Sequence, residues 1–218
     1  MKKKKIHGSN YILNDGSRAG SVTTIINSEL GWNKQTLINW AKKLSMQGYD
    51  VDEELRDSQQ TGILLHLLIE GHQNGFDVST KDFTRSQEET ALVAFGGYLE
   101  WVNLGRYVTL ASEVTLVNEE LRVGGTIDSI GTMENELVIT DFKSSKYGPY
   151  KEHIVQLAAY TYMYEAAQPK AKIAHGMILR FGKEDGKFHQ HKIEREKLNW
   201  GLSVFKHCVA LYNLKNNF

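Results

Sequence analysis

The stretch Gly124–Lys143 reads GGTIDSIGTMENELVITDFK, and it decides the fold that we expect for this chain. Two segments within it, Thr126–Ile130 and Leu137–Phe142, are rich in the β-branched and apolar residues that favour strands. The polar residues between these segments predict a hairpin turn with Glu134 and Asn135 at its centre. We therefore expect two antiparallel strands joined by a tight turn.

This hairpin brings two carboxylates and a lysine to one place. Asp128 lies opposite Asp141 in the expected register, with the two Cβ atoms roughly 5 Å apart. Side chains alternate between the faces of a strand, so Lys143 shares the face of Asp141 while Phe142 points the other way. Adjacent carboxylates repel unless a cation holds them together, and oxygen ligands favour Mg²⁺ or Mn²⁺. The pattern indicates metal-dependent phosphodiester chemistry, with a surface ion pair as the alternative.

A third strand candidate, Ala111–Asn118, adds another carboxylate. If the turn after it is centred on residues 120–121, Glu113 lies opposite Asp128. If the turn is centred one residue earlier, Glu113 lies opposite Thr126. Either register leaves Glu113 on the carboxylate face. There it would bind a second metal ion or hold a metal-bound water.

Composition favours a single domain over residues 1–218. The chain is 41% hydrophobic, which is enough to bury a substantial core. Residues 1 to about 105 are expected to form a helical part, and residues from about 106 to 218 the sheet core with a closing helix. The 26 basic and 26 acidic residues cancel, so nucleic-acid binding would need a local groove rather than a basic surface.

Cysteine usage and hydropathy exclude several classes of protein. Cys208 is the only cysteine, which excludes an intramolecular disulfide and any metal site built from several cysteines of this chain. We expect it to be a small buried residue of the last helix. Lysines 2–5 are followed by polar residues, and no apolar run approaches membrane-spanning length. A soluble, cytoplasmic protein is therefore expected.

Apolar spacing predicts the remaining elements. Helices are expected at about 33–46, 61–72, 86–104, 153–167 and 196–214, with a charged connection at 50–60, and strands at about 107–118, 172–181 and 188–193. The apolar residues of the first helix are Trp32, Leu37, Trp40, Ala41 and Leu44, and the expected buried stripe of the third is Ala91, Phe95, Tyr98, Leu99 and Val102. This order implies an α/β fold with a central mixed β-sheet flanked by helices.

The order of elements resembles the PD-(D/E)XK nuclease superfamily, which has a restriction-endonuclease-like αβββαβ core. That family carries an acidic residue on one strand and D/E-x-K on the next. Asp128 and the tripeptide Asp141-Phe142-Lys143 stand at these positions. The resemblance implies a nuclease fold with an N-terminal helical region.

The pattern is more specifically similar to the RecB-like branch of this superfamily. That branch adds a helix histidine before the sheet, G-x-x-D, and Q-x-x-x-Y on the following helix; here these are His66, Gly125–Asp128 and Gln156–Tyr160. The SVTTII segment at 21–26 and the tryptophan-bearing helix after it resemble single-strand DNA exonucleases of the mitochondrial genome maintenance type and their phage and bacterial relatives. With Cys208 alone, the chain departs from relatives that hold an iron–sulfur cluster, and we expect none.

The resemblance implies a role for each residue around the hairpin. Asp128 and Asp141 would be direct ligands of one or two Mg²⁺ or Mn²⁺ ions. The backbone carbonyl of Phe142 and the imidazole of His66 would complete the metal site. Lys143 would orient the attacking water and offset negative charge near the scissile phosphate.

Substrate contacts are expected after the hairpin. Gln156 and Tyr160 lie four residues apart on one helix face, and the resemblance implies that they organise the site and hold the substrate backbone. Without the resemblance, Tyr160 reads as a core residue. The intervening loop offers hydroxyls, a lysine and an aromatic ring that suit phosphates and bases, unless it is an ordinary polar loop. These loop residues are Ser144, Ser145, Lys146 and Tyr147.

Together these observations predict a metal-dependent DNA nuclease. Its expected mode is exonucleolytic, on single-stranded DNA or DNA ends, in recombination, repair or replication within a bacterial or phage-infected cell. The N-terminal helices would form the channel that admits a strand. A structure-specific DNA endonuclease and a non-catalytic DNA-end binding subunit are the alternatives.

Overall fold

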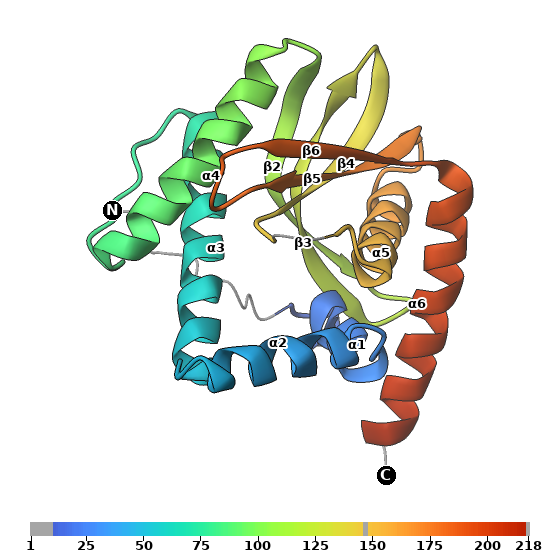
Figure 1. Cartoon of the computed structure of the whole chain (residues 1–218). Helices are drawn as coiled ribbons and strands as arrows, with labels where there is room; N and C mark the ends of the chain where they lie inside the picture. The colour runs from blue at the N-terminus through green and yellow to red at the C-terminus, as the bar shows by residue number, and fades with distance from the viewer. Residues whose placement is uncertain (1–10, 146–147, 217–218) are drawn as a thin grey trace.

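The structure is a computed structural model that describes residues 11–145 and 148–216 (Figure 1). The helices are α1 (Val22–Glu29), α2 (Lys34–Met46), α3 (Val51–Asn74), α4 (Arg85–Asn103), α5 (Lys151–Ala167) and α6 (Arg195–Asn216). The strands are β1 (Gly20–Ser21), β2 (Tyr107–Asn118), β3 (Val123–Met133), β4 (Glu136–Lys143), β5 (His175–Phe181) and β6 (Phe188–Ile193). They form one mixed sheet, which confirms the expected α/β class. None of the described helices is long and apolar enough to cross a membrane.

The β3–β4 hairpin has the predicted turn and register. Glu134 and Asn135 both have positive φ values, 52° and 66°, as a two-residue type I′ turn requires. Ser129 pairs with Thr140, as expected from that turn. The pairing ends there, one residue short of the two aspartates.

The turn between β2 and β3 decides between the two registers considered for Glu113. Asn118 pairs with Val123, so the turn is centred on residues 120–121. Glu113 therefore stands opposite Asp128, although these two do not form a ladder pair. Glu113 has a φ of 51°, which is uncommon for a residue with a side chain and interrupts the regular strand at this point.

The sheet forks along one edge of β3. β2 pairs antiparallel along the whole opposite edge, whereas the near edge is shared by two strands. There β4 covers residues 129–133, and β1 runs parallel beside Val123 and Gly124. Residues 125–128, the G-x-x-D motif, lie between β1 and β4, where no described strand pairs with that edge. The backbone edge of this motif is thus not covered by a neighbouring strand of the described chain.

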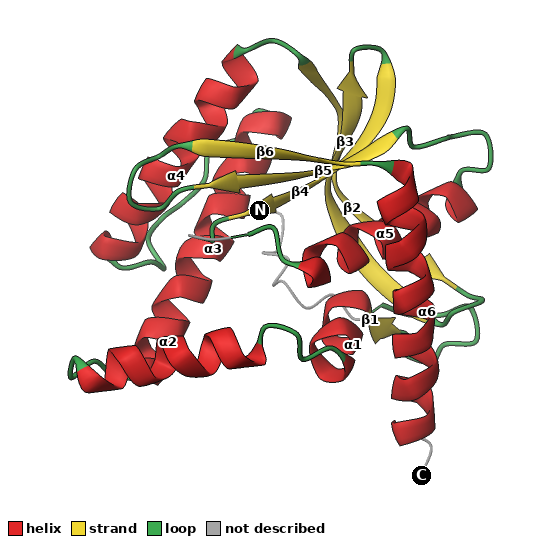
Figure 2. Ribbon diagram, turned by 45° about the vertical axis from the view of Figure 1, so that its right-hand side comes forward, coloured by secondary structure: helices red, strands yellow, loops and turns green. Residues whose placement is uncertain are grey.

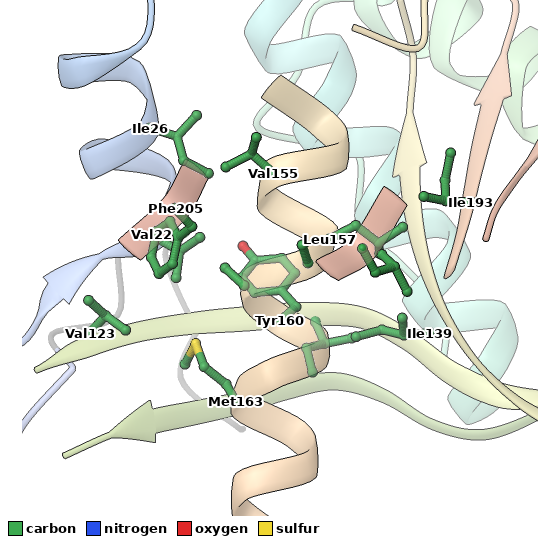
Figure 3. Packing of buried hydrophobic residues seen from close by; sticks show 14 of the residues in the cluster. Val22, Ile26, Val123, Ile139, Val155, Leu157, Tyr160, Met163, Ile193 and Phe205 are labelled. Carbon is green, nitrogen blue, oxygen red and sulfur yellow. The ribbon is translucent and has the colours of Figure 1, made fainter. Parts of the chain in front are cut away.

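Helices cover both faces of the sheet, and side-chain alternation divides the core in two (Figure 2). On one face, Ile139 and Ile178 pack with α1, α5 and α6 (Figure 3). On the other face, Val138 and Phe142 pack with α3 and α4. Burying alternate residues of β4 and β5 against opposite layers fixes the direction in which every side chain of these strands points.

The expected connection at 50–60 is helical instead. α3 begins at Val51, and the Asp50 carboxylate caps it by accepting hydrogen bonds from the backbone N–H groups of Asp52 and Glu53. Acidic residues in the first turn add to this because they favour the positive end of the helix dipole. The charged run is therefore a helix start. β1 and α1 have no expected counterpart, and the bounds of the remaining elements lie within about three residues of those expected.

α2 forms as predicted, but its apolar residues are not in the core. The helix has no buried residue, and Leu37 is 51% exposed. It runs between α1 and α3 along one border of the molecule (Figures 1 and 2). At its start, Trp32 stacks on Trp200 with ring centroids 6.1 Å apart, and the Asn33 N–H donates to Glu152 Oε1 at 3.1 Å.

One of the two glycines of α4, Gly97, has a packing reason. A Cβ at Gly97 would lie 2.0 Å from the carbonyl oxygen of Gly186, in the turn between β5 and β6, so only glycine allows this approach.

The buried stripe expected for α4 is correct at Ala91 and Tyr98, while Phe95, Leu99 and Val102 are only partly buried. Ala94 and Trp101 are buried in addition.

Candidate active site

The fork in the sheet opens into a pocket of about 590 Å³. It receives side chains from α3, β3, β4 and α5, because the uncovered edge of β3 faces the end of β4 and the first turns of α5. Six of the predicted residues line it: His66, Asp128, Asp141, Lys143, Gln156 and Tyr160.

Three residues from separate elements form a possible metal-binding set. Ligand atoms of His66 (α3), Glu113 (β2) and Asp128 (β3) all lie within 4.8 Å of one another. Two carboxylates and one imidazole are a donor set that suits a divalent cation. The structure thus groups Glu113 with Asp128 as possible metal ligands. The sequence had instead predicted Asp128 and Asp141 as the direct ligands, with Glu113 in a secondary role.

The expected pairing of Asp128 with Asp141 across the two strands is wrong in detail. The side chain of Asp128, rather than its backbone, accepts the hydrogen bond from β4. Asp128 Oδ2 accepts the Phe142 N–H at 2.7 Å, and Asp128 Oδ1 lies 3.5 Å from His66 Nδ1. His66 Nε2 donates to the Phe142 carbonyl oxygen at 3.1 Å, because a carbonyl can only accept. This ring of contacts brings the Phe142 carbonyl to the imidazole.

The contacts between His66 and Asp128 favour a protonated imidazole beside an ionised carboxylate. Burial is the largest single effect on the pKa of His66 and would lower it, but the charge and hydrogen bond of Asp128 together with the charge of Glu113 raise that pKa to about 8. Burial would raise the pKa of Asp128, yet His66, Lys143 and the Phe142 N–H together lower it. Asp128 is therefore ionised at neutral pH, in the form that binds a cation.

Lys143 joins the hairpin to α5. Its Nζ lies 3.0 Å and 2.8 Å from the two carboxylate oxygens of Asp141 and 3.2 Å from Gln156 Oε1. The amide of Gln156 in turn donates to the Tyr160 hydroxyl at 3.1 Å. This confirms that Asp141 and Lys143 share a face, with Phe142 buried on the other.

Burial raises the pKa of Asp141 to about 6, with the Asp128 charge adding to the rise and Lys143 opposing it. Burial would lower the pKa of Lys143, but the two aspartates raise it instead. Lys143 is thus a cation across the neutral range. It can donate hydrogen bonds and attract anions, but it has no lone pair with which to accept a proton.

Tyr160 belongs to both the core and the pocket. Tyr160 is 4% exposed and its ring packs in the core (Figure 3). Its hydroxyl accepts the hydrogen bond from Gln156. A Cβ at Gly125 would lie 2.5 Å from Tyr160 Cε1. The glycine of the G-x-x-D motif is therefore needed so that the ring can lie on β3.

Of the predicted residues in the loop after β4, the two that the structure describes, Ser144 and Ser145, do not line the pocket. The Ser145 carbonyl accepts a hydrogen bond from Arg180 at 3.1 Å. Lys146 and Tyr147 lie outside the described residues. No contact in the described chain supports a substrate role for this loop.

The N-terminal segment supplies pocket residues that the motifs did not indicate: Tyr11, Arg18, Ala19, Ser21, Thr23 and Thr24. Ser21 is the N-cap of α1, yet its hydroxyl contacts Thr23 Oγ1 at 2.9 Å instead of capping the helix. The hydroxyl residues around the start of a short helix, Ser21 before it and Thr23 and Thr24 in its first turn, are the signal that could have found them. Arg18 and these hydroxyls are groups that can contact phosphate oxygens.

Comparisons with known proteins agree with this geometry. The family model described as the PD-(D/E)XK nuclease superfamily matches residues 77–210, more than half of the chain. His66 lies before the matched residues, so the family model does not include it. The structure alone places His66 in the pocket. A search of curated proteins gave no match.

One of the similar solved structures shares the fold at low sequence identity. A candidate exonuclease from Eubacterium rectale has a TM-score of 0.51 and 14% identity, over 67% of this chain and 64% of that one. The alkaline exonuclease LHK-Exo from Laribacter hongkongensis has a TM-score of 0.40 and 10% identity, over 91% of this chain and 93% of its own. The present chain thus spans about two thirds of the Eubacterium rectale protein. By the match of the family model, the chain belongs to the PD-(D/E)XK nuclease superfamily.

Proposed function

We propose that this protein is a Mg²⁺- or Mn²⁺-dependent DNA nuclease, acting as an exonuclease on single-stranded DNA or DNA ends in recombination, repair or replication. Family membership supports a hydrolytic nuclease. The observation that carries the proposal is the convergence of His66, Glu113 and Asp128 within 4.8 Å of one another, beside the Asp141–Lys143 ion pair.

The residues present fit a divalent cation. His66, Glu113 and Asp128 offer one nitrogen and carboxylate oxygens from three separate elements, which is a donor set that binds a divalent cation. Asp141 and the Phe142 carbonyl lie beside this set as the further ligands that we propose. A bound ion would supply Lewis-acid charge to the phosphate and lower the pKa of a coordinated water.

The chain's own residues would position the substrate around that site. Asp141 and Gln156 hold the Lys143 ammonium at one place, and its raised pKa keeps it charged. A fixed cation there offsets the charge that develops on the phosphate during attack and can donate a hydrogen bond to the attacking water. Because Lys143 remains protonated, the proton of that water must leave by another route.

DNA binding would rest on local groups, because the chain has no net charge. Arg18 and the hydroxyls of Ser21 and Thr23 line the same pocket as the carboxylates. We propose that they hold the phosphates that flank the scissile one. Gln156 and Tyr160 would fix Lys143 rather than read bases, since their polar atoms bond to Lys143 and to each other.

The test is digestion of end-labelled single-stranded DNA in Mn²⁺ and in EDTA. Wild type should digest it only with metal, and Lys143→Ala should lose about a hundredfold or more of the rate. Lys192→Ala is the matched control, because Lys192 forms an exposed ion pair with a carboxylate two residues away, Glu194. Metal-dependent digestion by Lys143→Ala at the wild-type rate would contradict the site.

A circular single-stranded substrate tests the mode of cleavage. An obligate exonuclease leaves the circle intact while it degrades the linear form. Cutting of the circle at a comparable rate would instead identify an endonuclease. Binding of DNA ends without cleavage in any metal would identify a non-catalytic subunit.

A further inference from the structure

A second pocket, of about 330 Å³, lies between the start of α2 and the start of α5. Its lining residues are Trp32, Asn33, Thr36, Tyr150, Lys151 and Glu152. None of them lines the catalytic pocket, and the proposed chemistry does not use them. We call it the Trp32 pocket.

An aromatic surface and a cation meet in this pocket. Trp32 is 49% exposed, although it stacks on Trp200 with an interplanar angle of 22°. Lys151 Nζ lies 6.0 Å from the centroid of the Trp32 ring. A half-exposed indole supported by a second indole offers a flat apolar surface in a fixed orientation, with a positive charge over its ring.

The Trp32 pocket is formed partly by α5, the helix that also carries two residues of the catalytic pocket. The Glu152 carboxylate accepts the Asn33 N–H, which holds the start of α2 against α5. Lys151 is the first residue of α5, and Gln156 follows five residues later with its side chain in the catalytic pocket. At 1.5 Å of rise per residue, the two positions are roughly 7.5 Å apart along the helix axis.

We propose that the Trp32 pocket binds one unpaired nucleotide of the strand whose scissile phosphate lies in the catalytic pocket, with the base on Trp32 and a phosphate at Lys151. The inference rests on the proposed function and adds a subsite to it. An aromatic face stacks any base without sequence preference, and an ammonium neutralises a phosphate. Glu152 is engaged by Asn33, so its charge directs the phosphate to the Lys151 side. A base within a duplex is already stacked on both faces, so the pocket selects unpaired strands.

The test measures the binding of a long strand separately from the hydrolysis of the phosphodiester bond. Wild type, Trp32→Ala, Trp32→Phe and Lys151→Ala are compared on a long oligothymidylate and on the p-nitrophenyl ester of thymidine 5′-monophosphate. Trp32→Ala should raise KM for the oligonucleotide by about tenfold to a hundredfold with kcat nearly unchanged. Trp32→Phe keeps an aromatic face and should lose less. The ester reaches only the catalytic pocket, so its hydrolysis should not change.

Lys206→Ala is the control for Lys151→Ala, because Lys206 also contacts an aromatic ring, that of Tyr162, with Nζ 5.0 Å from the centroid. Lys151→Ala should raise KM for the oligonucleotide, and Lys206→Ala should not. Equal KM values for wild type, Trp32→Ala and Lys151→Ala, with wild type active, would overturn the subsite alone. An inactive wild type would overturn the proposed function, and fluorescence anisotropy of labelled oligothymidylate would then test the subsite by binding. Loss of affinity in both variants would support it, and unchanged affinity would overturn it.

Discussion

The helices α5 and α2 begin beside the same pocket but relate to the rest of the molecule in opposite ways. α5 buries eight of its residues between the sheet and α6, whereas α2 buries none. α2 is held near its start by Trp32 and Asn33 and continues through a short turn into α3. α5 therefore fixes the catalytic geometry, while α2 presents its side chains to the surroundings.

The largest expected effect is on the packing of α5. Leu157 is fully buried and lies directly against Gly176 of β5. Leu157→Ala should lower the free energy of unfolding by about 3 kcal/mol, because it removes apolar contacts and leaves a cavity. Urea unfolding measures this change. A loss below about 1 kcal/mol would show that α5 is not the rigid support described.

The next effect concerns the link from α5 to Lys143. Gln156→Ala removes one acceptor of the ammonium and the donor to the Tyr160 hydroxyl, so kcat should fall about tenfold to a hundredfold. Gln35→Ala is the matched control on α2, where that side chain only contacts Asn39 at the surface. Steady-state digestion of single-stranded DNA gives both values, and equal losses would contradict the difference between the two helices.

A smaller effect is expected where the helices meet. Glu152→Ala removes the acceptor of the Asn33 N–H and should cost about 1 kcal/mol of stability. It should also speed proteolytic cleavage within α2 in the folded protein. Glu89→Ala removes a carboxylate from an exposed ion pair on α4 and serves as the control. Unchanged cleavage of α2 would mean that other contacts hold its start.

The smallest effect is expected on the outer surface of α2. Leu37 is 51% exposed, so Leu37→Gln should change the free energy of unfolding by less than about 0.5 kcal/mol. The same urea experiment that tests Leu157→Ala measures it. A loss above about 2 kcal/mol would indicate that α2 is buried against another surface in solution.

Local patterns predicted the hairpin well, because its turn residues and alternating side chains encode their own geometry. Glu134 and Asn135 adopt the positive φ values of the expected turn, and Asp141 and Lys143 share a face as alternation requires. Helix α2 was predicted in the same way from a local pattern, the helical spacing of its apolar residues. Spacing specifies a helix, however, and not the surface against which it packs, so the exposure of Leu37 and Trp40 was not foreseen.

Long-range features of the site could not be predicted from spacing. The fork between β1 and β4 depends on Gly20 and Ser21 pairing with a strand about a hundred residues later, and nothing local encodes that contact. The left-handed backbone of Glu113 likewise follows from its surroundings. The helical start at Asp50 did have a local signal, a capping aspartate before acidic residues, which was read as a charged connection.

The most direct test of the site is a calorimetric Mn²⁺ titration of wild type and Glu113→Gln, with Glu100→Gln, an exposed residue of α4, as the control. If His66, Glu113 and Asp128 hold the metal, wild type and Glu100→Gln should bind Mn²⁺ alike. Glu113→Gln should bind at least about tenfold more weakly, because it loses an anionic ligand. Equal Mn²⁺ affinity for Glu113→Gln and wild type would contradict the proposed metal site.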